Sequence, residues 1–243
     1  MHGAEALSAL VEESGMSREH ADAIACLLDV WESRLPKNVL RRRYYEGDNV
    51  LKDLGISIPP NLRNVATVVG WPKKAVSSMS TRSRFDGFTV SGDDGVQDAL
   101  DSLVAKTNLK RKYKQACESE LIAGCDFITL SKGAEGEPPV IITTHSAETC
   151  AAVWDERLGR ISSGLAIMHF GSEGPDEVAL YTSDMTVHVD ARDGFRYEEM
   201  PHKLGRPLME AMAYNPTESK PLGQSRITRA VRSITDSGVR EAL

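Results

Sequence analysis

The chain has 243 residues, 41% hydrophobic and 26% charged, the balance of an ordinary soluble protein that can bury a core. Its formal net charge of -6 argues against a protein whose whole surface holds DNA, although a local basic strip remains compatible with it. Since the N-terminus lacks a signal peptide and no stretch approaches the roughly 18 to 20 apolar residues that cross a bilayer, we expect a cytosolic protein or part of a soluble assembly, without a membrane partner.

The first predicted helix begins after Ser17, a residue that can cap a helix N-terminus. Its apolar residues recur with the spacing of one helix face: Ile24, Leu27, Leu28, Trp31 and Leu35. Pro36 is predicted to interrupt this helix. A second helical piece is predicted to end at Gly47, because glycine accepts the left-handed conformation of a helix C-cap.

Three consecutive arginines, Arg41, Arg42 and Arg43, lie near the end of this second piece and are followed by Tyr44 and Tyr45. Basic side chains suit the negative end of a helix dipole, and tyrosines pack through their rings while the hydroxyl stays polar. The structural interpretation is therefore a basic helix end with amphipathic packing residues.

Further helical segments follow. Residues 62–83 read as two helical pieces joined at Gly70 to Pro72, with Pro72 at the start of the second piece. Residues 84–95 read as a short strand-like edge between turns. Residues 96–108 and 109–124 read as two more helices, the latter ending at Gly124.

From Cys125 onward the sequence favours β structure. Short runs rich in β-branched and aromatic residues alternate with turn clusters, which predicts a single antiparallel meander. The runs are 125–131, 139–145, 148–155, 159–170, 177–183, 184–191 and 194–200. Met185, Val187 and Val189 alternate with polar residues, so one face of that strand is expected to be solvated.

The chain returns to helix in residues 225–243, where Ile227, Ala230, Val231 and Ile234 form an apolar stripe. The sequence stops inside this helix, which predicts either a longer protein or a docking partner. The expected fold class is α+β, with helices at both ends and a central, mainly antiparallel sheet. We divide it into a helical part, 1–124, and a sheet part with the terminal helix, 125–243, which together form one composite domain.

No segment carries a clear catalytic or cofactor-binding motif. Neither a phosphate-binding glycine loop nor a nucleophile elbow is present, so we expect no cofactor and no catalytic residue. Histidines on predicted strands, His169 and His188, are more commonly hydrogen-bonded sheet residues than bases. Asp93 and Asp94 are explained by turn chemistry, and they lack the alternating pattern of a calcium loop.

The residues with metal-binding chemistry also argue against a metal site. The candidates for zinc are Cys117, Cys125, His145 and Cys150, but the first two cysteines are too far apart in sequence for a zinc knuckle. Together with Cys26 these are all the cysteines of the chain, too few for a disulfide framework. Reduced, buried thiols and no metal are therefore expected.

The order of the segments resembles the portal proteins of tailed double-stranded DNA bacteriophages, particularly of long-tailed phages and prophages. The resemblance rests on the segments "RRRYYEGDN", "NLRNVATVVGWPKKAVSSMSTRSRFDGF", "NLKRKYKQACESELIAGCDFITL", "ITTHSAETCAAVWDERLGRISSGLAI" and "KPLGQSRITRAVRSITDSGVREAL". It covers roughly residues 35 to 243.

This resemblance implies a structural subunit of a ring, typically a dodecamer, at one capsid vertex. Such a ring is a conduit for DNA packaging and ejection and a head-tail connector, with terminase, capsid and head-tail adaptor proteins as partners. It implies a virion protein assembled in the host cytoplasm. An acidic chain suits a conduit, because tight phosphate contacts would arrest the DNA. Portal subunits are usually longer, so the chain resembles their wing-like part, without stem, clip and crown.

Within that resemblance, Arg41, Arg42 and Arg43 have two possible roles: contacts between subunits, which we prefer, or contacts with packaged DNA. Two rival functions remain open. One is an enzyme with a site between the helices and the sheet that uses His145 or His169. The other is a standalone DNA-binding adaptor, which the acidic balance disfavours.

Overall fold

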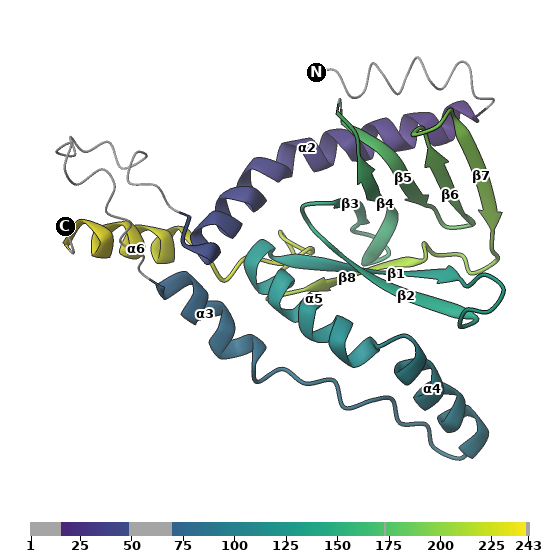
Figure 1. Ribbon diagram of the computed structural model, residues 1–243, viewed down its shortest axis with the longest axis horizontal. Helices are drawn as coiled ribbons and strands as arrows, with labels where there is room; N and C mark the ends of the chain where they lie inside the picture. The colour runs from purple at the N-terminus through teal and green to yellow at the C-terminus, as the bar shows by residue number, and fades with distance from the viewer. Residues whose placement is uncertain (1–15, 49–69, 173, 242–243) are drawn as a thin grey trace.

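The computed structural model describes residues 16–48, 70–172 and 174–241 of the chain, and these form a mixed α+β fold (Figure 1). The helices before the sheets are α2 (Arg18–Glu46), α3 (Trp71–Ser80), α4 (Asp94–Lys106) and α5 (Leu109–Ala123). The strands are β1 (Cys125–Lys132), β2 (Val140–Ser146), β3 (Cys150–Asp155), β4 (Arg160–Phe170), β5 (Pro175–Tyr181), β6 (Met185–Asp190), β7 (Arg196–Pro201) and β8 (Met209–Ala213). The last helix is α6 (Arg229–Glu241). The α+β class predicted from the sequence is confirmed.

The strands form two antiparallel sheets, so the prediction of one meander is wrong. A five-stranded sheet has the order β3-β4-β5-β6-β7, and a three-stranded sheet has the order β2-β1-β8. The chain leaves the small sheet at the turn after Ser146, since β2 pairs with β1 whereas β3 pairs with β4. Strand β8 was not predicted, because its sequence Met-Glu-Ala-Met-Ala has little intrinsic preference for strand. Its pairing with β1 imposes the extended conformation.

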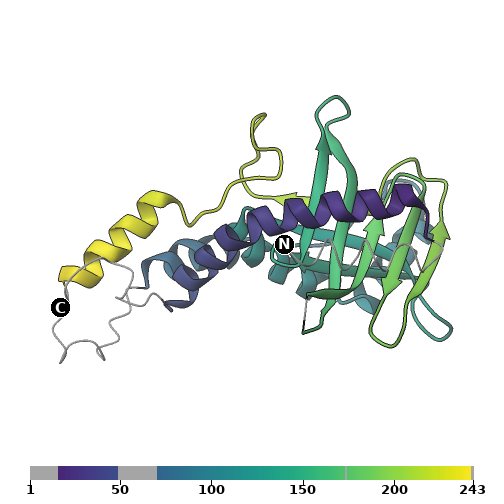
Figure 2. The same cartoon turned by 90° about the horizontal axis from the view of Figure 1, so that it is seen from above.

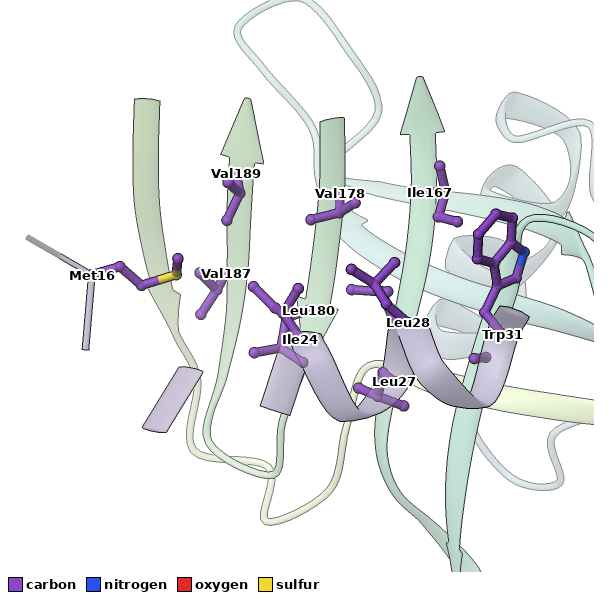
Figure 3. Packing of buried hydrophobic residues seen from close by; sticks show 12 residues of the cluster. Met16, Ile24, Leu27, Leu28, Trp31, Ile167, Val178, Leu180, Val187 and Val189 are labelled. Atoms are coloured by element: carbon purple, nitrogen blue, oxygen red, sulfur yellow. The ribbon is translucent and has the colours of Figure 1, made fainter. Parts of the chain in front are cut away.

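Helix α2 covers one face of the five-stranded sheet. Its buried side chains Ile24, Leu27, Leu28 and Trp31 pack against strand residues including Ile167, Val178, Leu180, Val187 and Val189 (Figure 3). The helix begins at Ser17, whose hydroxyl accepts the backbone N–H of His20 at 3.2 Å, as the sequence predicts. The predicted alternation along β6 is also present, although Thr186 on the opposite face is buried and that face is only partly solvated.

Helix α2 continues through Pro36, which contradicts the predicted interruption. A proline inside a helix costs about 3 kcal/mol, because it removes one backbone hydrogen bond and crowds the preceding turn. Hydrogen bonds made by residues before and after the proline offset this cost. Trp31 Nε1 donates to the carbonyl of Glu148 at 2.7 Å, and Asn38 Nδ2 donates to the carbonyl of Ala147 at 2.9 Å. Both partners lie in the turn between β2 and β3, so the helix is held on one structure before and after the proline.

The other face of the five-stranded sheet packs on the small sheet, and this makes a second core. Buried residues of this core come from β1, β3, β4, β5 and β8, among them Phe127, Ile161, Ala166, Tyr181 and Met209. Helices α4 and α5 cover the small sheet, where Val104 and Leu109 meet Ile142. The molecule therefore stacks helix, sheet, sheet and helix.

Residues 84–90 belong to no strand, so the strand-like edge predicted for residues 84–95 is wrong. Their backbone is held by a side chain instead of a strand. The N–H of Val90 donates to Gln97 Oε1 at 2.9 Å, and Gln97 Nε2 donates to the carbonyl of Phe88 at 3.0 Å. The side-chain amide of α4 thus occupies the place of a neighbouring strand.

Helices α3 and α6 lie at the end of the molecule remote from the five-stranded sheet, in both views (Figures 1 and 2). The predicted stripe of the last helix is only partly buried. Ile227 is 1% exposed but precedes α6, while Ile234 is 60% exposed and Thr235 is buried in its stead. The first predicted helical piece of residues 62–83 lies outside the described residues, and the second is α3, with Pro72 in its first turn.

The predicted boundary near residue 124 coincides with the change from helix to strand. Both sides of it share cores, since α2 packs on the five-stranded sheet and α5 contributes to the core between the sheets. As a division into parts it stays a prediction.

Candidate functional site

The three arginines at the end of α2 have different surroundings. Arg41 is half-buried, and its Nη1 donates to the carbonyl of Ala123 at the end of α5. Burial lowers the pKa of Arg41 below its usual range, and the neighbouring charge of Arg232 lowers it further. The side chain therefore joins α2 to the end of α5.

Arg42 forms an ion pair inside the chain. Its Nε lies 2.5 Å from Glu148 Oε1, and its Nη1 lies 3.9 Å from Glu46 Oε1. Glu148 belongs to the turn between β2 and β3, to which Trp31 and Asn38 also donate hydrogen bonds, so three side chains of α2 bind this turn. Nothing in the sequence pattern identifies this turn as the partner, because the contact spans over a hundred residues.

Arg43 is exposed and contributes mainly through its backbone. Its carbonyl accepts the N–H groups of Gly47 and Asp48 at 3.0 Å each, and Gly47 has the left-handed φ of 83°. The predicted C-cap is thus confirmed. Of the three arginines, Arg43 is the one whose side chain faces solvent, and the role of the triplet in contacts with a partner stays a prediction.

Two tyrosines connect the end of α2 to the surrounding helices. The hydroxyl of Tyr44 donates to Asp236 of α6, with both carboxylate oxygens at 3.0 Å. The hydroxyl of Tyr45 donates to Glu118 Oε1 of α5 at 2.7 Å. Burial, followed by the contact with Glu118, raises the pKa of Tyr45 to about 12, so this hydroxyl remains a donor at neutral pH. We call the place where α2, α3, α5 and α6 meet the helix junction.

The loop before α6 is fastened to the end of α5 by backbone contacts. Tyr214 N donates to the carbonyl of Gly124 at 3.0 Å, and Arg226 N donates to the carbonyl of Leu121 at 2.8 Å. Ser225 Oγ donates to the carbonyl of Ile122 at 2.5 Å. These bonds fix the position from which α6 starts.

Gly223 permits the close approach of the two backbones in this loop. Its φ is 80°, and a Cβ at this position would lie 2.3 Å from the carbonyl oxygen of Gly124 and 2.7 Å from that of Tyr214. Any larger residue would have to push these backbone atoms apart. The "PLGQS" segment therefore has a steric reason for its glycine.

One buried and one half-buried carboxyl group, Asp126 and Glu120, lie near the end of α5. Asp126 is 2% exposed, and burial raises its pKa to about 7. Glu120 is half-buried, and burial raises its pKa to about 7 as well. A buried carboxyl without a cationic partner is more stable in its neutral form. The sequence gives no sign of this, because burial of Asp126 depends on the packing of α5, with Ser119 and Glu120, on the face of β1 that points away from the five-stranded sheet.

The candidates for zinc do not converge. Within the described ranges no three His, Cys, Asp or Glu side chains form a group that could hold a metal. Cys117, Cys125 and Cys150 are buried free thiols, whereas Cys26 is exposed. Burial raises the pKa of Cys125 to about 12, so its thiol is protonated and unsuited to act as a ligand or nucleophile.

The histidines considered as catalytic bases have local partners. His145 Nε2 lies 3.0 Å from Thr129 Oγ1 across the β1–β2 pair, and burial lowers the pKa of His145. His169 Nδ1 lies 2.6 Å from Asp176, and His188 Nε2 lies 3.0 Å from Glu177. Each contact joins adjacent strands, which is the pattern of sheet-stabilising pairs.

Asp93 has the role expected from turn chemistry. It is the N-cap of α4, with Oδ1 accepting the N–H of Val96 at 3.1 Å, and Asp94 lies in the first turn of the same helix. Both carboxylates also suit the positive end of the helix dipole.

The sequence matches the family profile described as "Phage portal protein, SPP1 Gp6-like" over residues 25–236. It is 26% identical over 208 residues to the portal protein of Mycobacterium phage L5, and 25% identical over 208 residues to that of Mycobacterium phage D29. Each alignment covers 81% of this chain and 42% of the relative, so the chain spans less than half the length of these relatives. In the described part of the chain, none of the helices has the length and hydropathy that a membrane span requires.

Proposed function

The chain belongs to the SPP1 Gp6-like family of phage portal proteins, and on that premise we propose that it acts as a structural subunit of a portal ring at a capsid vertex. The observation that carries this proposal is the extent of the family match. It runs from within α2 to within α6 and so includes the helix junction, both sheets and the loop that fixes α6.

The ring is proposed to be a dodecamer that serves as a conduit for double-stranded DNA during packaging and ejection, and as a head-tail connector. Its proposed partners are terminase, capsid and head-tail adaptor proteins, in the host cytoplasm during assembly and in the virion afterwards. The net charge of -6 supports a conduit that does not hold the polyanion tightly. The proposed role requires no catalytic activity of this chain, which agrees with the naming of both relatives as portal proteins.

Within such a ring the helix junction has a mechanical role. The bonds of Tyr44 and Tyr45, together with the backbone contacts around Gly223, set the direction of α6 relative to the two sheets. We expect this direction to be the same in every copy, because a closed ring requires identical interfaces. The junction therefore supports assembly by limiting the range of shapes that a subunit can take.

The arginine triplet keeps its proposed role in subunit contacts, with Arg43 as the group that is free to reach a neighbour. A reversal of Arg42 would be a poor test, since it would place two negative charges together at Glu148 inside the same chain. Arg43→Glu leaves these internal contacts intact. If the triplet contributes to the interface, this variant weakens assembly while its circular dichroism and melting temperature stay at the wild-type values.

Electron microscopy and sedimentation velocity test the proposed function directly. We expect ring-shaped particles with rotational symmetry from the purified chain, or from a chimera in which the chain replaces the matching segment of the phage L5 portal protein. If both proteins fold but stay single copies at all concentrations, the proposal fails. Turnover of any substrate that is lost on mutation of His145 or His169 would favour the enzyme instead.

A further inference from the structure

Charge is strongly segregated along this acidic chain. Residues 33–45 contain Arg34, Lys37 and Arg41 to Arg43 but no aspartate or glutamate, and residues 219–235 contain four further cations and no acid. Residues 85–105 show the opposite, with five aspartates and no lysine or arginine. A surface with interspersed charges would not show such runs.

The fold brings the two basic segments together. Arg34, Lys37 and Arg41 have the i, i+3, i+7 spacing of one face of α2, and the guanidinium of Arg232 in α6 lies 5.7 Å from the ring centre of Tyr44. Arg41 first, and then burial, lower the pKa of Lys37, and the charges of Arg34, Lys220 and Arg232 act in the same direction. We call these five residues the basic cluster: Arg34, Lys37, Arg41, Lys220 and Arg232.

The basic cluster lacks internal counter-charges. In the part of the chain that the structure describes, no carboxylate oxygen lies within 4 Å of a charged nitrogen of these five residues. Arg34, Lys37 and Lys220 are exposed. Neutral groups contact three of them, since Arg41 donates to the carbonyl of Ala123, Lys220 donates to Gln224 and Arg232 lies over the ring of Tyr44. Among the described residues no negative charge neutralises the cluster, so an acidic partner would relieve the repulsion among the five cations.

The acidic run forms a surface of its own on α4. Asp94, Asp98 and Asp101 follow the i, i+4, i+7 spacing of one helix face, and Asp93 and Asp86 lie beside its N-terminus and in the extended segment before it. All five are exposed, and none forms an ion pair with a described residue. We call these five residues the acidic face: Asp86, Asp93, Asp94, Asp98 and Asp101.

A cavity within the acidic face has room for a long side chain. Its volume is about 330 Å³, and its walls include Asp86, Asp101, Val104 and Asn108, with Lys110 also lining it. A lining that combines two carboxylates with apolar residues suits a lysine or arginine, whose stem is apolar and whose head is charged. The acidic face therefore offers shape as well as charge to a basic partner.

The two surfaces cannot satisfy each other within one copy, because α4 and α6 lie at opposite ends of the molecule (Figure 1). We propose that the basic cluster of one copy of this chain docks on the acidic face of the next copy. Such a contact joins two different patches, so it is head-to-tail and closes into a ring when the rotation per copy allows it. The inference rests on the proposed portal function and names the faces that the subunits use.

A second copy of the chain accounts for both charged surfaces, whereas DNA accounts for the basic cluster alone. Duplex DNA would account for the basic cluster but would leave the acidic face without a partner, and the net charge of -6 opposes its approach. A second copy matches five cations with five aspartates. Complementary charges of this kind set register and speed of association more than raw affinity.

The test uses two charge-reversed variants of the chain. One carries Arg34→Glu and Lys37→Glu, and the other carries Asp98→Lys and Asp101→Lys. Each variant alone brings like charges together and should associate at least about tenfold more weakly than the wild type. Mixed in equal amounts, the variants again present opposite charges at each contact, so association should return to within a few-fold of the wild type.

Sedimentation velocity at low and high salt measures the association, and circular dichroism verifies that both variants fold. A matched control reverses two exposed cations elsewhere, Arg157→Glu and Lys203→Glu, and should leave association unchanged. Wild-type association should weaken at high salt, because salt screens exposed charges.

Three results would overturn the inference. The first is wild-type association of either variant alone, and the second is a mixture that stays dissociated. The third is loss of duplex-DNA affinity in the Arg34→Glu, Lys37→Glu variant with its association unchanged, which would assign the basic cluster to DNA. If both charge-reversed variants still form rings, the proposed contact between the basic cluster and the acidic face is rejected, but the proposed portal function is not. Absence of rings from the wild-type chain and from the chimera rejects the portal function itself.

Discussion

The buried carboxyl of Asp126 leads to a prediction about how stability depends on pH. Its pKa is about 7 in the folded protein, against an ordinary value of 3.8. The folded state thus binds the proton more tightly than the unfolded chain. The resulting stabilisation is complete below about pH 4, is lost as the pH rises toward 7, and changes no further above that.

The magnitude follows from the difference between the two pKa values. At about 1.4 kcal/mol for each pKa unit, the shift from 3.8 to about 7 corresponds to about 4 kcal/mol. Asn at this position keeps the shape of the neutral acid and cannot ionise. The stability of Asp126→Asn relative to the wild type should therefore increase by about 2 to 4 kcal/mol between pH 4.5 and pH 8.

Urea unfolding followed by tryptophan fluorescence measures this difference at pH 4.5, 6 and 8. Glu120 titrates over the same range but is present in both proteins, so it largely cancels. Asp190→Asn is a control that should show no pH dependence over this range, because hydrogen bonds from Arg192 hold the pKa of Asp190 below its ordinary value of 3.8. The wild-type contribution of Asp190 to stability is therefore lost only as the pH falls below about 4. A difference between Asp126→Asn and the wild type that stays constant from pH 4.5 to 8 would refute the reasoning.

Three substitutions test the packing and the helix junction by thermal or urea unfolding. Ile24→Ala should cost about 2 to 5 kcal/mol because the side chain is 0% exposed in the core under α2, whereas Ile234→Ala at 60% exposure should cost under about 0.5 kcal/mol; equal losses would contradict the assignment of the core. Gly223→Ala should cost more than Gly205→Ala, since both have positive φ and incur about 1 kcal/mol of backbone strain but only Gly223 has backbone atoms in the way of a Cβ. Pro36→Ala should raise stability by about 1 to 2 kcal/mol, because it restores a backbone hydrogen bond of the helix. A loss of stability would show instead that the helix backbone at this position fits proline better than alanine.

The local signals in the sequence were reliable where neighbours along the chain decide the structure. Ser17 caps α2, and Gly47 and Gly124 end α2 and α5, because a cap depends on residues within one helical turn. The first seven strands are where the β-rich runs predicted them, since alternating apolar residues and turn clusters are also local.

Errors arose where distant contacts decide the outcome. Pro36 does not end its helix, because Trp31 and Asn38 hold it to a turn that lies over a hundred residues away. Strand β8 exists through its pairing with β1, and residues 84–90 stay outside a sheet, where Gln97 bonds the backbone of Phe88 and Val90. Intrinsic secondary-structure propensity does not take such partners into account, since it is a property of short segments.

In the candidate site, too, the sequence determines some features and the tertiary structure determines others. The sequence alone determined the charge runs, the cap at Gly47 and the order of segments that resembles portal proteins, because all three are properties of the linear chain. Only the tertiary structure decided that Arg41 and Arg42 have internal partners, that Asp126 is buried, and that two basic segments share one end while the acidic run lies at the other. The physical reason is that burial and charge pairing depend on distances in space, and folding sets these distances between residues remote in sequence.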